Sequence, residues 1–198
     1  FQSEKTSEGS VYTLEYGSEV QRRQFARQLI IDEDESSLTI DTGRLKIKVN
    51  KSQFAPFAEI QRDGQPYLTG SRIIVTGADG VEYTSTNATP EAVEIEEAGP
   101  MRCVVRVEGQ HRSADGEPLF RSICRIYAYA GLPFIRLEHT FVNDNTTEKF
   151  TEITSMVLHL DTSSGTAKEV EIRQTHDNRC TINGEVREER ANGAISAG

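Results

Sequence analysis

Five arginines and two tyrosines recur through the middle of the chain in a pattern that could bind an anion. They are Arg102, Arg106, Arg121, Arg125, Tyr127, Tyr129 and Arg136. A guanidinium binds a carboxylate through two parallel hydrogen bonds, and an aromatic face stacks on a sugar ring or on a guanidinium plane. We therefore predict a surface that binds an acidic saccharide. Its predicted contact residues are Arg106, Arg125, Tyr127, Tyr129 and Arg136.

The local charge sets this stretch apart from the rest of the sequence. The 198 residues carry a formal net charge of -9, yet arginines outnumber acidic residues between positions 101 and 140. Two plainer structures fit the same pattern: a sheet face that is only solvated, and a face that another domain covers. The residues alone leave these alternatives open.

Three alternating segments must position these side chains. They read MRCVVRVEG from 101, LFRSICRIYAY from 119 and FIRLEHTFV from 134. Because successive side chains of a strand point to opposite faces, the arginines and tyrosines share one face and the apolar residues share the other. We predict an antiparallel β-meander whose polar face is the candidate surface.

The turn at 130–133 sets the register between the second and third segments. Pro133 cannot donate to a ladder, so it belongs in the connection or at a strand start. A pairing of Tyr129 with Phe134 places apolar residues opposite each other on one face and opposite charges on the other, whereas a one-residue slip would reverse the faces. The predicted pairs are Tyr127 with Arg136, Arg125 with Glu138, Ile126 with Leu137, and Cys124 with His139.

The sequence pattern of the remaining residues predicts more short strands joined by turns. Asp63-Gly64 and Asp79-Gly80 each predict a hairpin turn. Pro66 predicts that the return strand at 65–69 lies at an edge of the sheet. Segment 25–31 is ambiguous between helix and strand, and strand is favoured. Further strands are predicted at 38–49, 57–62, 72–76, 81–85, 92–96, 150–160, 170–173 and 179–182. We predict an all-β fold, an antiparallel β-sandwich or barrel of about 10–14 short strands.

Length and composition limit the possible classes of protein. We expect a single β-domain over 1–187 and a tail or linker over 188–198. The chain begins with Phe1, so we expect it to have been processed or cut from a longer protein. No run is long and apolar enough for a membrane helix, and the negative charge argues against a nucleic-acid binder.

No residue can be assigned to catalysis from the sequence. The phosphate-binding, hydrolase and zinc motifs are absent, and the cysteine spacings match no metal or redox site, so we expect neither a metal nor a cofactor. Cys103 and Cys124 share the apolar face; buried free thiols are favoured over a disulfide. His111 falls in a hairpin loop after Gly109, whereas His139 and His159 fall in strands. For a strand histidine on the apolar side, a satisfied core residue is the plainer interpretation and a proton-transfer residue at a sugar site the alternative.

Three segments together resemble a known family. They are LTIDTGRLKIKVNK at 38–51, AEIQRDGQPYL at 58–68, and GPMRCVVRVEGQH with FRSICRIYAYAGLPFIRLEHTFVN between 99 and 143. This order is similar to the N-terminal β-domain of the exo-rhamnogalacturonan lyase-like family. It is more loosely similar to the sugar-facing β-sandwiches of galactose mutarotase-like proteins. The resemblance covers roughly residues 38–160.

The resemblance implies a large multidomain, secreted or periplasmic enzyme that cleaves acidic plant polysaccharide by β-elimination. This chain would be a fragment of it without autonomous activity, supporting catalysis or binding sugar. Its partners would be an acidic polysaccharide or oligosaccharide and further domains of the same full-length chain. No catalytic motif of the family matches positions here. A non-catalytic carbohydrate-binding module and a structural interaction module are the alternatives.

Overall fold

The computed structural model describes residues 16–20, 29–146 and 150–163 with their side chains, and four further strands by their backbone. Except for one short 3₁₀ turn, η1 (Ser85–Asn87), every regular element in the described part is a β-strand. The all-β antiparallel prediction is therefore confirmed. The first strands in chain order are β1 (Ile30–Glu33), β2 (Ser37–Asp41), β3 (Leu45–Asn50), β4 (Glu59–Arg62), β5 (Gln65–Gly77), β6 (Glu82–Thr84) and β7 (Ala92–Ala98).

The meander follows, and the chain then returns to the first half of the sheet. The meander strands are β8 (Arg102–Arg112), β9 (Pro118–Tyr129) and β10 (Ile135–Val142), and the return strand is β11 (Ile153–Thr162). Two hairpins complete the order: β12 (Val170–Arg173) with β13 (Arg179–Ile182), and β14 (Arg187–Arg190) with β15 (Ala194–Ala197). The last hairpin lies where a tail or linker was expected; the domain boundary at 187 stays a prediction.

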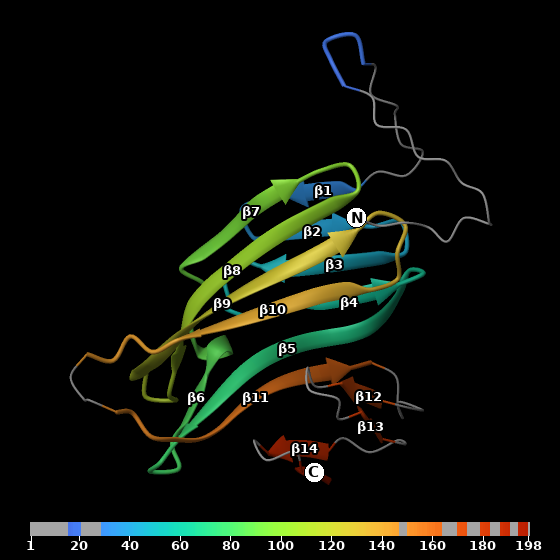
Figure 1. Ribbon diagram of the computed structural model, residues 1–198. Helices are drawn as coiled ribbons and strands as arrows, with labels where there is room; N and C mark the ends of the chain where they lie inside the picture. Colours follow the sequence, from blue (N-terminus) through green and yellow to red (C-terminus); the bar gives the residue numbers. More distant parts are fainter. Residues whose placement is uncertain are drawn as a thin grey trace.

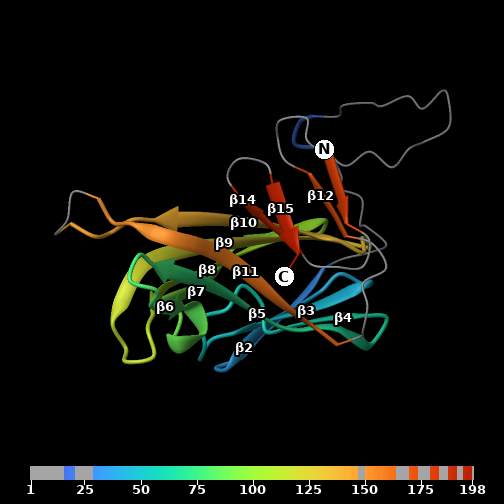
Figure 2. The ribbon, with the colours of Figure 1, turned by 90° about the horizontal axis from the view of Figure 1, so that it is seen from below.

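Eleven strands form one sheet that folds over into two layers (Figure 1). Their order is β1-β2-β3-β4-β5-β6-β8-β9-β10, with β7 beside β8 and β11 beside β5. Seen from below, the layer of β8 to β10 faces the layer of β2 to β4 (Figure 2). The short strand β6 connects the layers, since it pairs with β5 and, through Thr84 opposite Arg112, with β8.

The register predicted for the meander is confirmed. Arg136 lies opposite Tyr127, Leu137 opposite Ile126, Glu138 opposite Arg125, and His139 opposite Cys124. The physical reason is the one that the sequence indicates: this register keeps Ile126 in the core, packs the half-buried Leu137 against it, and leaves the charged residues outside.

Two expectations about the strand after Asp63-Gly64 are wrong. The segments at 65–69 and 72–76 are one strand, β5, and β5 is internal because it pairs with β4, β6 and β11. Continuity through Ser71 is held by its buried hydroxyl, which accepts from the Phe57 amide at 3.0 Å and donates to the Phe57 carbonyl at 2.7 Å. Pro66 is tolerated because β11 pairs with β5 only from Leu68 onward, so no partner needs its missing N–H.

The core lies between the two layers and is made of alternate residues of the facing strands. The fully buried side chains include Leu38, Ile40, Ile47, Val49, Phe54, Val105, Val107, Cys124 and Ile126. The ring of Phe54 packs directly on Gly109 of β8, where an added Cβ would lie 2.6 Å from a ring carbon. Gly109 is therefore required by packing.

The meander cysteines are buried free thiols, as the sequence favoured. Cys103 lies opposite Ala128, whereas Cys124 lies opposite Val107, so the two sit four positions apart along the paired strands. Burial raises the pKa of Cys103 to about 11 and that of Cys124 to about 12. Both thiols therefore stay protonated and pack as small apolar groups. The side chain of Cys180 lies outside the described residues.

Candidate functional site

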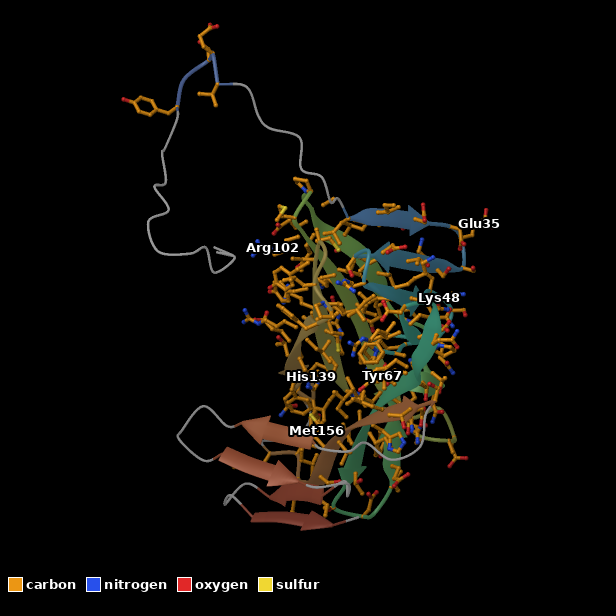
Figure 3. All side chains as sticks on the ribbon, turned by 90° about the vertical axis from the view of Figure 1, so that its right-hand side faces the viewer. Glu35, Lys48, Tyr67, Arg102, His139 and Met156 are labelled. Carbon is orange, nitrogen blue, oxygen red and sulfur yellow. The ribbon has the colours of Figure 1, made fainter. Side chains whose placement is uncertain are left out.

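The five predicted contact residues lie together on the outer face of the meander. Arg106 comes from β8, Arg125, Tyr127 and Tyr129 from β9, and Arg136 from β10. Alternation along each strand puts them on the face away from the core. In Figure 3, Arg102 of β8 and Lys48 of β3 lie on opposite sides of the sandwich, which marks its two outer faces.

Glutamates neutralise the arginines of this face. Arg125 makes a bidentate pair with Glu96, with nitrogen–oxygen distances of 2.7 and 2.9 Å. Arg106 bonds Glu94 at 3.0 Å and also contacts Glu108. The remaining contacts are Arg102 with Glu97, Arg121 with Glu91 and Glu108, and Arg136 with Glu138. The face is therefore a network of ion pairs.

Most of these glutamates come from β7 or the residues just before it. Strand β7 runs beside β8, with Glu94 directly opposite Arg106. A hydrogen bond from Arg125 lowers the pKa of Glu96, and one from Arg102 lowers the pKa of Glu97. The sequence predicts a strand at 92–96 but not its position beside the arginines. The alternation of glutamates in AVEIEEA is the signal that could have indicated it.

Arg136 differs from the other arginines of the face. Its side chain is 62% exposed, the largest exposed fraction among them, and its carboxylate partner among the described residues, Glu138, lies on its own strand. Its guanidinium carbon lies 5.2 Å from the centre of the Tyr127 ring. The Tyr127 hydroxyl donates to Glu138 at 2.7 Å, and this bond raises the pKa of Tyr127.

An aromatic pair extends the surface beside Arg136. The rings of Tyr129 and Phe134 are 5.4 Å apart, and Phe134 is 49% exposed. The end of the meander thus combines the most accessible guanidinium of this face with accessible aromatic rings. Such a combination can bind a carboxylate and stack on a sugar ring.

A buried serine connects two histidines under the meander. The Ser122 hydroxyl oxygen lies 3.2 Å from Nε2 of His111 and 2.7 Å from Nε2 of His139. Nδ1 of His111 lies 3.3 Å from the Phe120 carbonyl, which can only accept, so this nitrogen carries the proton. Ser122 then donates to His111 and accepts from His139. Desolvation lowers the pKa of both histidines.

This arrangement corrects the expectation for His111. It lies inside β8 and is fully buried, although a loop was predicted there. The strand continues through His111 because its pairing with β9 shifts register between Gln110 and His111. The neighbouring strand adapts as well, since Phe120 has a positive φ of 57°. His111 is thus a satisfied core histidine. The sequence favoured that interpretation for the strand histidines His139 and His159, and there it is wrong, because both side chains are exposed.

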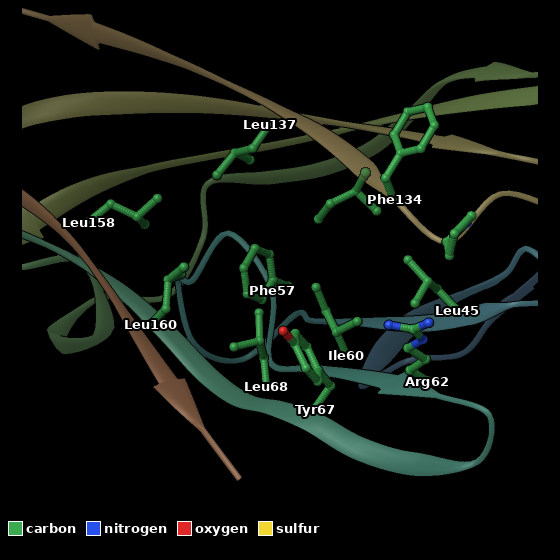
Figure 4. Close-up of a pocket in the computed structure, with 12 residues that line it drawn as sticks. Leu45, Phe57, Ile60, Arg62, Tyr67, Leu68, Phe134, Leu137, Leu158 and Leu160 are labelled. Carbon is green, nitrogen blue, oxygen red and sulfur yellow. The ribbon is translucent and has the colours of Figure 1, made fainter. Parts of the chain in front are cut away.

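An apolar groove opens between β10 and β11, and the sequence did not predict it. It encloses about 370 Å³ (Figure 4). Its wall on one side is Pro133, Phe134, Ile135 and Leu137, and on the other Tyr67, Leu68, Leu158 and Leu160. Leu45, Phe57 and Ile60 form its floor, and Arg62 stands at one end. A smaller cavity of about 230 Å³ continues it to His139 and Met156.

A metal-binding cluster and a membrane-spanning helix are both absent from the described residues. No group of three or more histidine, cysteine, aspartate or glutamate side chains there is arranged to hold a metal ion. Within the same residues, no helix has the length and apolar character needed to cross a membrane.

The chain is similar to known proteins over most of its length. Residues 29–189 match the family described as the PcRGLX-like protein central beta sandwich domain. One relative is "Uncharacterized protein YetA" of Bacillus subtilis (strain 168), which is 28% identical over 125 residues. That alignment covers 59% of this chain but 15% of the relative, so the chain spans a small part of that protein.

These matches agree with the rhamnogalacturonan lyase-like resemblance and with the β-sandwich. The family description puts the domain at the centre of its proteins, where the resemblance suggested the N-terminus. The chain belongs to the PcRGLX-like family, and residues 29–189 are its central β-sandwich domain.

Proposed function

We propose that this chain is the sugar-holding β-sandwich of a polysaccharide lyase-like protein that acts on acidic, rhamnogalacturonan-type polysaccharide. The observation that carries the proposal is the end of the meander, where the exposed Arg136 lies over Tyr127 and beside the Tyr129–Phe134 pair. Arg136 would bind a uronate carboxylate and the rings would stack on neighbouring sugars. The chain alone would bind without cleaving.

The ion pairs suggest two different roles for the predicted contact residues. Arg106 and Arg125 are held by glutamates of β7, so they would keep the surface rigid and flat rather than bind ligand directly. Glu138 would compete with the ligand for Arg136, because it is the carboxylate already bound to that guanidinium. A uronate must displace Glu138 or share Arg136 with it.

Because Arg136 would bind the ligand and Glu138 would compete for Arg136, substitutions at these two positions should change the affinity in opposite directions. Arg136→Ala should weaken binding of rhamnogalacturonan oligosaccharides roughly tenfold, the effect of losing one charge-assisted contact. Glu138→Gln should tighten binding, because it removes the competing charge. Isothermal titration calorimetry at low and moderate salt measures both. Arg62→Ala is the matched control: its side chain is 59% exposed, and it lies in the other layer. Unchanged affinity in Arg136→Ala would contradict the proposal.

A second function, that of a structural module joining other domains, has its own support. The arginines of the meander face are largely neutralised, and the groove between β10 and β11 leaves apolar side chains accessible. Exposed apolar patches mark interaction surfaces. Absence of oligosaccharide binding together with stable association with the remainder of the protein would favour this function over the first.

A further inference from the structure

Strands β10 and β11 are edge strands of the folded sheet, as β1 and β7 also are. Among the described strands, β10 pairs only with β9 and β11 pairs only with β5. Half of the backbone N–H and C=O groups of an antiparallel edge strand point away from its neighbour and remain available for pairing. Figure 2 looks at the molecule from the side on which β11 lies.

These edges lack the usual protection against pairing. Neither strand contains lysine or proline, and the charged residues of both, such as Glu138 and Asp161, belong to the outward-facing positions. The side chains that line the gap are apolar and accessible: Leu158 is 44% exposed and Leu160 43%. An accessible apolar edge is a site for strand addition.

The space between the two edge strands is lined by apolar side chains that would pack against one additional strand. Ile135 and Leu137 of β10, and Leu158 and Leu160 of β11, enter the same groove from opposite sides. A strand laid between them would point alternate side chains into the cavity of about 370 Å³. Arg62 lies at one end of the groove, and its ion pair with Asp63 is long, 3.8 Å, so its guanidinium can donate to another carboxylate.

We propose that an extended segment from a neighbouring domain of the full-length protein docks between β10 and β11. It carries alternating apolar residues for the groove and an acidic residue for Arg62. Two findings favour this occupant: the family describes the domain as central, and the aligned part of the relative YetA is 15% of that protein, so much chain lies outside this domain there. The inference rests on the second function above and is independent of sugar binding.

Hydrogen exchange in the full-length protein tests the proposal. Leu158→Asp should speed amide exchange in β10 and β11 at least tenfold, because it removes an apolar contact of the docked segment. His159→Asp is the matched control: it is the next residue, its side chain is 45% exposed, and it belongs to the outer face. The control should leave exchange in both strands unchanged.

The same amides should exchange faster in this chain alone than in the full-length protein. Equal rates in the two proteins, or equal effects of Leu158→Asp and His159→Asp, would overturn the proposal. Protection of β10 and β11 in this chain that appears only as it dimerises, detected by light scattering, would also overturn it and assign the groove to a second copy. Sugar affinity is measured separately, so the two failures are distinguishable.

Discussion

At the scale of single residues, the availability of each meander arginine for a ligand depends on the carboxylates that contact it. Period-two alternation predicts which side chains share the outer face, and all five residues predicted to contact the ligand do share it. It cannot predict that Glu94 and Glu96 reach Arg106 and Arg125, because those pairs depend on where β7 joins the sheet. Arg136 escapes this neutralisation in part, since β7 lies beside β8 and not beside β10.

The His111–Ser122–His139 connection gives the domain a pH-dependent stability. Both histidines have pKa values lowered from 6.5 in the folded state, so the unfolded chain binds more protons as the pH falls below that value. Their contribution is complete above pH 6.5 and is lost as the pH drops toward the folded-state pKa values. We expect a lower urea midpoint at pH 5.5 than at pH 7.5.

His139→Gln should reduce that difference between the two midpoints, because it removes one of the titrating groups while keeping a donor for Ser122. The carboxylates with lowered pKa values, such as Glu96 and Glu97, stay ionised throughout this range and do not interfere. A midpoint that is equal at pH 7.5 and pH 5.5 in the unmodified chain would contradict the assignment of two histidines that are neutral in the folded state.

At the scale of elements, hydrophobic alternation and turn residues predict the pairing register of β9 with β10 correctly. The agreement arises because one face is buried, so a slip would expose Ile126 and Leu137. The prediction fails where long-range pairing decides. Strand β5 is one internal strand because β11, which begins 76 residues after β5 ends at Gly77, returns to pair with it. No local pattern at 65–77 contains that information.

Gly109 tests the packing of the two layers against each other. Gly109→Ala should destabilise the domain by about 1–3 kcal/mol, because the new methyl group would overlap the Phe54 ring, 2.6 Å away. Chemical denaturation measures the loss. Gly43→Ala is a control with no atom within 4 Å, although its φ of 78° adds backbone strain of its own. Full relief of the Gly109→Ala defect by Phe54→Leu would show that the ring is the cause.

At the scale of the whole molecule, the domain presents two different surfaces to possible partners. The outer meander face is polar, ion-paired and aromatic at one end, whereas the open side between β10 and β11 is apolar. The first suits a charged saccharide and the second suits a strand of polypeptide. The groove could not be predicted from sequence, because the pattern around Leu158 and Leu160 is that of ordinary core residues. Their exposure follows from the open edge of the sheet beside them, which only the structure shows.

The most direct test of sugar binding is a titration of the ¹⁵N-labelled chain with rhamnogalacturonan oligosaccharides, followed by NMR. We predict that amide shifts change at Tyr127, Tyr129 and Arg136 and at their neighbours on β9 and β10, and that the changes shrink as salt is added. Shifts confined to the β2–β4 layer, or no shifts at millimolar oligosaccharide, would contradict the proposal that the meander face holds an acidic saccharide.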